Sequence, residues 1–203
     1  MCFWQSLRPH FLCRYCDSEC SRKPPNAHSL GRYAPFKKKK MKRQNLSIKN
    51  EISEILDDFI EVCKYSRINL TKDEIIVEIL ESGDKHSPKP LHKGFMAVYI
   101  FWDFEKNICY KVGKVGVNSN ARFQSQHYNP NSSKSNLATS ILNDYELNHS
   151  LEIQNNVGLW IKQNTTRINL YLKGENSMLT LSLLEIFIQN RLKPKYEGYE
   201  SQL

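Results

Sequence analysis

The sequence predicts an α+β fold, in which a small antiparallel or mixed sheet is flanked by helices and preceded by a helical hairpin. Three observations predict this class. Apolar residues recur at three- and four-residue steps over residues 46–66, which is the period of an amphipathic helix. From Phe95 onward the apolar runs become short, and some alternate with polar residues, as in strands. A last helical stripe closes the chain before Pro194, a residue that ends helices.

The helical hairpin is expected over residues 46–82. The apolar stripe of its first helix consists of Ile52, Ile55, Leu56, Phe59, Ile60 and Cys63. The second helix should begin at Thr71-Lys72-Asp73-Glu74, which has the pattern of a capping box. Its stripe consists of Ile75, Ile76, Ile79 and Leu80. We interpret the hairpin as a packing layer or as the interface of a homodimer. A DNA-reading helix-turn-helix is disfavoured, because the exposed positions are more acidic than basic.

A linker and a β-hairpin are expected next. Gly83, Pro88 and Pro90 end the helical pattern. Residues 95–102 are apolar at every position, which predicts a central strand covered on both faces. A polar turn over residues 103–107 leads to a partner strand over residues 108–112.

The rest of the chain predicts short elements joined by polar loops. They are a helix that begins at Asn118-Ser119-Asn120 and carries Arg122, a loop over 129–136, a helix over 137–142, a half-buried strand over 168–172, and a helix over 177–191.

The positive charge of the chain is concentrated at its start. The net charge is +8, yet residues 1–40 hold nine basic and two acidic residues. The remainder is therefore nearly neutral, and the net charge alone does not predict a nucleic-acid partner. Position is more informative, because basic residues surround the β-hairpin and the helix after it. They are Lys93, Lys106, Lys111, Lys114, Arg122 and Lys134.

Three segments are predicted from these shifts in composition. Residues 1–40 are expected to be a disordered tail or an extension outside the working protein, since Met41-Lys42-Arg43 resembles a bacterial start. A zinc knuckle formed by Cys13, Cys16, Cys20 and His28 is the alternative. Residues 41–90 hold the helical hairpin and the linker, and residues 91–203 form the domain with the candidate chemistry.

Cysteine use and hydropathy predict a cytoplasmic protein. Cys63 and Cys109 lie singly inside apolar patterns, which argues against a disulfide framework. The longest apolar run, residues 95–102, is far shorter than the roughly 18 residues that a membrane helix needs. No membrane association is expected.

Four residues have the chemistry that phosphodiester cleavage requires. The reaction needs a base for water, a cation beside the phosphorane, and a metal or an acid at the leaving oxygen. Tyr99, Lys111, Arg122 and Glu185 could supply these functions. Each also has a structural explanation: a core tyrosine, a solvated strand lysine, a surface arginine and a helix carboxylate in an ion pair.

Residues 93–197 resemble the GIY-YIG nuclease superfamily. Ala97-Val98-Tyr99 is similar to its first signature and Val112-Gly113-Lys114 to its second. Arg122, Phe123 and His127 match its first helix, and Glu185 matches its metal-binding glutamate. Pro194 and Tyr196 match its C-terminal pattern. The resemblance implies a small sheet flanked by helices and one divalent metal held mainly by a glutamate.

Three positions depart from the family pattern. Ala97 stands where glycine is usual in the first signature. Lys111 stands where the second tyrosine is usual, with Tyr110 one residue earlier. Because neighbouring strand residues point to opposite faces, we do not expect Tyr110 to replace it. Glu197 stands in place of the terminal asparagine.

The resemblance implies a metal-dependent endonuclease acting on nucleic acid, with DNA as the expected partner. Tyr99 would act as general base or orient the water, Lys111 would assist it, and Arg122 would stabilise the phosphorane. His127 would assist proton transfer or contact phosphate, and Glu185 would hold Mg²⁺ or Mn²⁺. The nucleic-acid contacts would come from Lys111, Lys114, Arg122 and Lys134. The alternatives are a binding module that has lost catalysis and a protein-interaction domain acting through residues 46–82.

Overall fold

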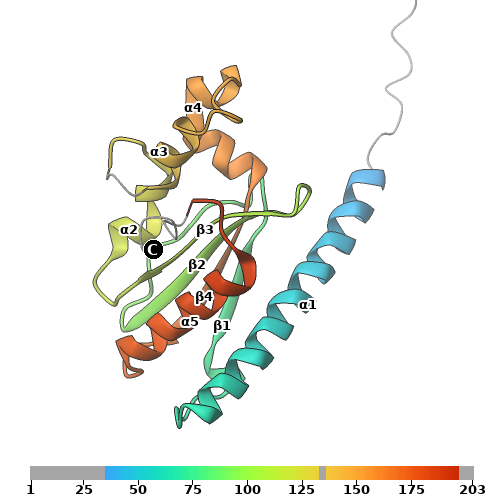
Figure 1. Ribbon diagram of the computed structural model, residues 1–203. Coiled ribbons are helices and arrows are strands. Elements are labelled where there is room, and N and C mark those ends of the chain that lie inside the picture. Colours follow the sequence, from blue (N-terminus) through green and yellow to red (C-terminus); the bar gives the residue numbers. More distant parts are fainter. Residues whose placement is uncertain (1–34, 133–135, 197–203) are drawn as a thin grey trace, which may run out of the picture.

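The computed structural model describes residues 35–132 and 136–196, and it confirms the α+β class (Figure 1). The sheet has four antiparallel strands in the order β1-β4-β2-β3. The strands are β1 Ile76–Leu80, β2 Phe95–Asp103, β3 Ile108–Val115 and β4 Thr166–Lys173. The helices are α1 Pro35–Tyr65, α2 Asn120–Gln124, α3 Leu137–Leu142, α4 Leu151–Asn164 and α5 Met178–Leu192, with 3-10 turns η1 Lys72–Glu74 and η2 Gln126–Tyr128.

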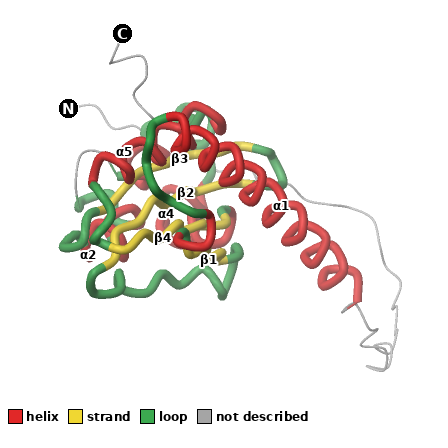
Figure 2. Tube along the Cα trace, turned by 90° about the horizontal axis from the view of Figure 1, so that it is seen from below, coloured by secondary structure: helices red, strands yellow, loops and turns green. Residues whose placement is uncertain are grey.

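Helices α1 and α5 cover one face of the sheet, which we call the α1/α5 face. The two helices lie side by side in both views (Figures 1 and 2). Their apolar residues form one core with side chains from alternate positions of the strands. The strand residues of this core include Val98, Ile100, Val112, Ile168 and Leu170. Burial of this face is the main stabilisation that holds the two helices to the sheet.

Helix α1 confirms the first predicted helix but begins earlier. It starts at Pro35 and not near residue 46, so the predicted boundary at residue 40 falls inside a helix. The predicted stripe is buried in the core of this chain, from Ile52 to Cys63. That stripe therefore packs within the chain. The proposed zinc knuckle lies outside the described residues.

The prediction of a second helix in the hairpin is wrong, because residues 76–80 form strand β1. The capping box is present, with the Thr71 amide donating to Glu74 Oε2 at 2.8 Å, but it opens only the single turn η1. β1 then pairs antiparallel with β4 along its whole length. The residues of β1 are mostly β-branched, which favours a strand where a partner strand is available. Residues 41–90 thus contribute one helix and one edge strand.

A β-bulge in the β-hairpin overturns the expectation that Tyr110 and Lys111 point to opposite faces. Phe101 of β2 lies opposite Lys111, while Trp102 lies opposite Cys109, so that the register shifts by one residue. Cys109 belongs to the α1/α5 face, whereas Tyr110 packs on the opposite face. Such an extra residue disturbs the alternation of side chains. Tyr110 and Lys111 therefore lie on the same face of the sheet.

That opposite face, which we call the α2–α4 face, is covered by α2, η2, α3 and α4. Its core includes Tyr99, Phe101, Phe123, Leu137 and Ile161. Helix α4 was not predicted from the sequence, and its backbone is interrupted at Asn156. The expected strand at residues 95–102 is confirmed as the buried β2, and the expected final helix is confirmed as α5, capped by Ser177.

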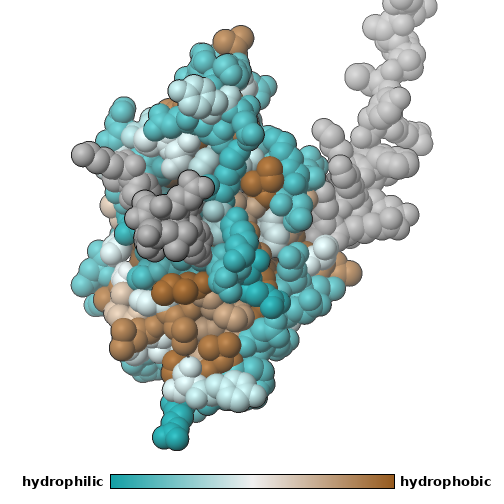
Figure 3. Space-filling view, in the orientation of Figure 1, coloured by the Kyte–Doolittle hydropathy of each residue, from teal (hydrophilic) through white to brown (hydrophobic). Residues whose placement is uncertain are grey.

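Helix α5 is apolar on its outer side as well as its inner side. Met178, Leu179 and Ile186 are at least half exposed, and an apolar area lies over α5 in Figure 3. Beyond α5, the amides of Lys195 and Tyr196 donate to the carbonyls of Cys109 and Tyr110, which covers part of the outer edge of β3. In the described part of the chain, no helix has the length and apolar content needed to cross a membrane.

Candidate functional site

A row of polar residues crosses the sheet on the α2–α4 face. Glu78 of β1 lies opposite Asn169 of β4, Asn169 lies opposite Tyr99 of β2, and Tyr99 lies opposite Gly113 of β3. Asn169 and Tyr99 are fully buried. Buried polar groups need hydrogen-bond partners, and the contacts of this row define the candidate site.

Gly113 makes room for the Tyr99 phenol. A Cβ atom at position 113 would lie 2.6 Å from Cζ of Tyr99, and its hydroxyl oxygen would be nearer still. The second motif glycine is therefore required by packing, since any side chain would occupy the volume of the first motif tyrosine.

His127 donates a hydrogen bond to Tyr99. The Nε2 atom lies 2.7 Å from the Tyr99 hydroxyl oxygen, and the Leu137 amide donates to Nδ1 at 3.3 Å. Because Nδ1 accepts, the proton of a neutral imidazole must be on Nε2. His127 thus donates to the Tyr99 oxygen and cannot take its proton in this arrangement. In this arrangement His127 can orient and polarise the phenol.

Positive charges surround this pair. Burial, together with the charges of Lys111, Arg167 and Arg122, lowers the pKa of His127 to about 3. His127 is buried, whereas Arg122 is exposed on α2. A concentration of positive charge beside a phenol and a neutral imidazole favours an anionic ligand such as phosphate.

A second buried histidine supports the same region. His86 Nδ1 lies 2.8 Å from the Thr165 carbonyl oxygen and Nε2 lies 2.7 Å from the Tyr128 hydroxyl. Since a carbonyl only accepts, Nδ1 carries the proton and Tyr128 donates to Nε2. Burial is the main cause that lowers the pKa of His86 to about 4, and the charges of Arg167 and Lys162 act in the same direction.

Acid should therefore destabilise this protein through its two buried histidines. An unfolded histidine, with a pKa of 6.5, binds a proton that the folded protein accepts only near pH 4 or 3. The free energy of unfolding should fall as the pH drops from about 6.5 towards 4, by up to about 1.4 kcal/mol per pH unit for each histidine. Urea denaturation across this range measures the slope. His86→Gln should reduce it by about half, whereas the exposed His149→Gln should leave it unchanged; equal slopes in all three proteins would contradict the assignment.

Arg167 is a site residue that the sequence reasoning missed. Its side chain on β4 is fully buried. It lies over the rings of Phe123, Phe101 and Tyr99, with its guanidinium carbon 4.5, 5.4 and 5.6 Å from their centroids. The available signal was its place in the alternating run Thr166–Lys173, where the charged residue falls on the same side as Asn169.

The far end of the polar row is a carboxylate. Tyr171 donates to Glu78 Oε2 at 2.5 Å, and Asn169 Nδ2 donates to the same oxygen at 2.8 Å. Burial and the Glu78 charge raise the pKa of Tyr171. This carboxylate thus has two neutral donors, and Asn169 separates it from Arg167.

Glu185 and Lys114 lie on the α1/α5 face, away from the Tyr99 pair. Lys114 Nζ forms an ion pair with Glu185 Oε2. Lys114 neighbours the buried Val112 and Val115 on β3 and lies one position from Gly113, so its side chain points to the opposite face from Tyr99. The predicted site residues are therefore in two groups, one on each side of β3. Lys111 and Lys114 thus lie on opposite faces of the same edge strand, β3.

The donor set for Mg²⁺ is small. Among the described residues, no group of three or more His, Cys, Asp or Glu side chains could hold a metal ion. Mg²⁺ often binds through one or two carboxylates and completes its shell with water and substrate phosphate. Glu185, whose side chain is 12 % exposed, meets this minimum, but Lys114 competes for the same oxygen.

Tyr110 is on the face of the site without joining the Tyr99 pair. Its hydroxyl is buried and has no hydrogen-bond partner within the described residues. Burial raises its pKa to about 12. Its ring stacks on Tyr196, whose hydroxyl donates to Asp144 at 2.5 Å. The structure therefore gives Tyr110 a packing role at the bulge. Lys134 and Glu197 lie outside the described residues.

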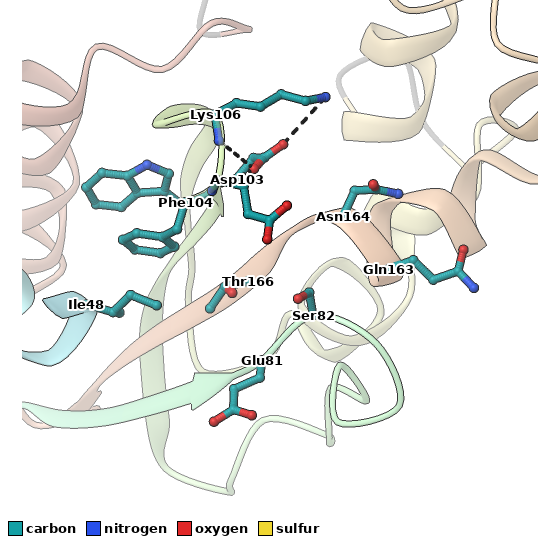
Figure 4. Close-up of a pocket in the computed structure, with 11 residues that line it drawn as sticks. Ile48, Glu81, Ser82, Asp103, Phe104, Lys106, Gln163, Asn164 and Thr166 are labelled. Atoms are coloured by element: carbon teal, nitrogen blue, oxygen red, sulfur yellow. Dashed lines mark hydrogen bonds and ion pairs between the residues drawn. The ribbon is translucent and has the colours of Figure 1, made fainter. Parts of the chain in front are cut away.

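A cavity at one end of the sheet does not hold the candidate residues. It has a volume of about 200 Å³ and lies at the ends of β1, β2 and α4 (Figure 4). Asp103 in its wall accepts from the amides of Glu105 and Lys106 and so stabilises the β2–β3 turn. This carboxylate therefore has a structural role, and the cavity stands apart from the Tyr99–His127 pair.

Comparison with protein-family models, with curated proteins and with solved structures finds no match for this chain. A function for this protein has to be inferred from its own residues.

Proposed function

We propose that this protein is a metal-dependent endonuclease that hydrolyses phosphodiester bonds of a nucleic acid, with DNA as the expected substrate. The observation that carries the proposal is the hydrogen bond from His127 to the Tyr99 hydroxyl, set beside the charges of Lys111, Arg122 and Arg167. Those charges would stabilise the negative charge that develops on a phosphate during attack by water.

Each residue of the Tyr99 group would have a separate role. Tyr99 would orient the water or, in its phenolate form, accept a proton from it, and the His127 Nε2–H would stabilise the negative charge of that phenolate oxygen. Arg122 is exposed and would contact the phosphate directly. Tyr99 and His127 are buried, so substrate binding would have to open the site locally beside them. Mechanisms that require such a closing or opening step are common.

Glu185 would hold the metal ion on the other side of β3. When bound, Mg²⁺ or Mn²⁺ would supply a Lewis acid for a phosphate oxygen. Because β3 is an edge strand, a nucleic-acid backbone that follows this edge could contact Lys111 on one face and Lys114 on the other.

A nucleic-acid-binding module without cleavage is the second candidate. Two features favour it. Tyr99 is buried away from substrate, and Lys114 pairs with the Glu185 carboxylate that would bind the metal. The protein-interaction alternative through residues 46–82 loses its support, since the stripe of α1 is buried and the second helix is β1.

A nicking assay with Mg²⁺ on supercoiled DNA tests the proposal. The parent protein should nick the DNA, and Glu185→Gln should abolish nicking while binding persists. Glu146→Gln is the matched control, because Glu146 also pairs with a lysine but is exposed. Nicking that survives Glu185→Gln would contradict the metal role of Glu185. If the parent protein does not nick DNA, the endonuclease proposal fails and the binding module is the remaining candidate.

Melting with and without Mg²⁺ gives a second readout. At a tenfold excess over Kd, Mg²⁺ should stabilise the parent by about 1.4 kcal/mol. Lys114→Gln should increase this effect at a given Mg²⁺ concentration, because it removes the competitor for the carboxylate. If Mg²⁺ stabilises Glu185→Gln as much as the parent, Glu185 is not the ligand.

A further inference from the structure

Arg167 holds a buried positive charge that, in the described part of the chain, forms hydrogen bonds to neutral acceptors alone. Its side chain is 0 % exposed. Nε donates to Asn169 Oδ1 at 2.9 Å, Nη1 to the Tyr128 hydroxyl at 3.2 Å, and Nη2 to the Phe123 carbonyl at 2.6 Å. Within the described residues, Glu78 is connected to Arg167 only through Asn169.

Stability alone does not explain this arrangement. A buried ion normally has a counter-ion, because the desolvation of a charge costs several kcal/mol. Stacking on aromatic rings and three hydrogen bonds offset part of that cost. An apolar residue of similar volume would avoid the cost altogether. Residues that break such local rules are concentrated at functional sites.

The three hydrogen bonds join three elements of the site. The Phe123 carbonyl is among the last four of α2, which have no partner inside the helix. Arg167 thus caps the C-terminus of α2, where a cation is favourable. Tyr128 ends η2, directly after His127. With only five residues, α2 is too short to be stable by itself, so its orientation depends on contacts of this kind.

We propose that Arg167 is a positioning residue that orients α2 and η2, so that Arg122 faces the substrate phosphate and His127 faces the Tyr99 hydroxyl. Arg167 does not itself touch the substrate, because it is fully buried beneath these elements. The inference rests on the proposed function in one respect: it assumes that Arg122 contacts a nucleic-acid phosphate.

A double-mutant cycle on the full chain tests the coupling. The probe is a short DNA duplex of mixed sequence, and its affinity is measured against salt concentration. Arg122→Ala should lower the slope of log affinity against log salt by about one. Arg167→Met should lower it by a similar amount although Arg167 is buried. Adding Arg122→Ala to Arg167→Met should then change affinity less than about twofold, because the contact is already lost.

Two further variants separate positioning from charge and from stability. Arg167→Lys keeps the charge but cannot span three acceptors, so it should restore little of the Arg122 contribution. Arg191→Met removes an exposed arginine that pairs with Asp58 at 2.8 Å on the α1/α5 face. Arg191→Met should leave the DNA affinity and its salt dependence unchanged, both alone and combined with Arg122→Ala. If the losses of Arg122→Ala and Arg167→Met add fully, Arg167 has only a structural role and the inference fails.

Hydrogen exchange provides a readout that needs no nucleic acid. The amides of Phe123, Ser125 and Tyr128 form the hydrogen bonds of α2 and η2. Arg167→Met and Arg167→Lys should accelerate their exchange at least about tenfold relative to the amides of β2, while Arg191→Met should not. If Arg122→Ala has no effect on DNA binding, the proposed function fails and this exchange decides the role of Arg167 alone. Unchanged exchange would overturn the inference even where DNA binding is confirmed.

Discussion

Replacing Gly113 with alanine is expected to damage the candidate site severely. The added Cβ would lie 2.6 Å from Cζ and 2.9 Å from Cε2 of Tyr99. The Tyr99 ring is fully buried and also touches His127 and Phe101, so it cannot move aside freely. Overpacking of this kind costs about 1–3 kcal/mol. Displacement of the phenol by about 1 Å should reduce nicking roughly 100-fold.

Gly116→Ala is the matched control for this change. Gly116 lies on the same segment, and a Cβ there would meet only the Met178 side chain, at 3.7 Å. Urea denaturation and the nicking assay should show no significant effect of Gly116→Ala. If Gly113→Ala also changes neither stability nor nicking, the Tyr99 phenol does not lie against Gly113.

Removing the Tyr99 hydroxyl should have the second large effect. In Tyr99→Phe, the Nε2–H of His127 loses its acceptor at a buried position. An unsatisfied buried donor costs about 1–3 kcal/mol, and loss of a general base typically lowers the rate roughly 10²–10⁴-fold. DNA binding should change little, because the cations of the site remain.

Tyr110→Phe separates the two motif tyrosines. The Tyr110 hydroxyl has no hydrogen-bond partner within the described residues, so its removal should be neutral or slightly stabilising. Nicking should also persist. A loss of nicking in Tyr110→Phe with normal stability would show that Tyr110 is the functional second tyrosine, and that Lys111 does not assist Tyr99.

Local pattern was sufficient for the elements with a strong period. The helical stripe of α1, the apolar run of β2 and the cap of α5 at Ser177 were all predictable. The strand at residues 168–172 was also predicted, but as half-buried, whereas β4 is buried on both faces up to Leu172. Their residues face a single environment along the whole element, so that sequence period and burial agree. The α+β class follows from these elements together.

Non-local pairing decided what the pattern could not. Residues 76–80 carry an apolar stripe that suits either a helix or a strand, and their hydrogen bonds to β4, some ninety residues later, determine the outcome. The bulge at Tyr110 likewise exists only in the paired hairpin, since its definition is two residues opposite one. Both features depend on the pairing register between strands, and a single sequence does not specify that register.

For the candidate site too, the sequence determined one part and the tertiary structure another. The sequence by itself determined the residue types: a tyrosine, a lysine, an arginine, a histidine and a glutamate at motif spacing. Only the tertiary structure decided that Tyr99 and His127 lie on one face of the sheet while Lys114 and Glu185 form an ion pair on the other. It also placed Arg167 beneath the site, because its three acceptors come from three separate elements. Such a contact set depends on how the chain folds back on itself, and no local period encodes it.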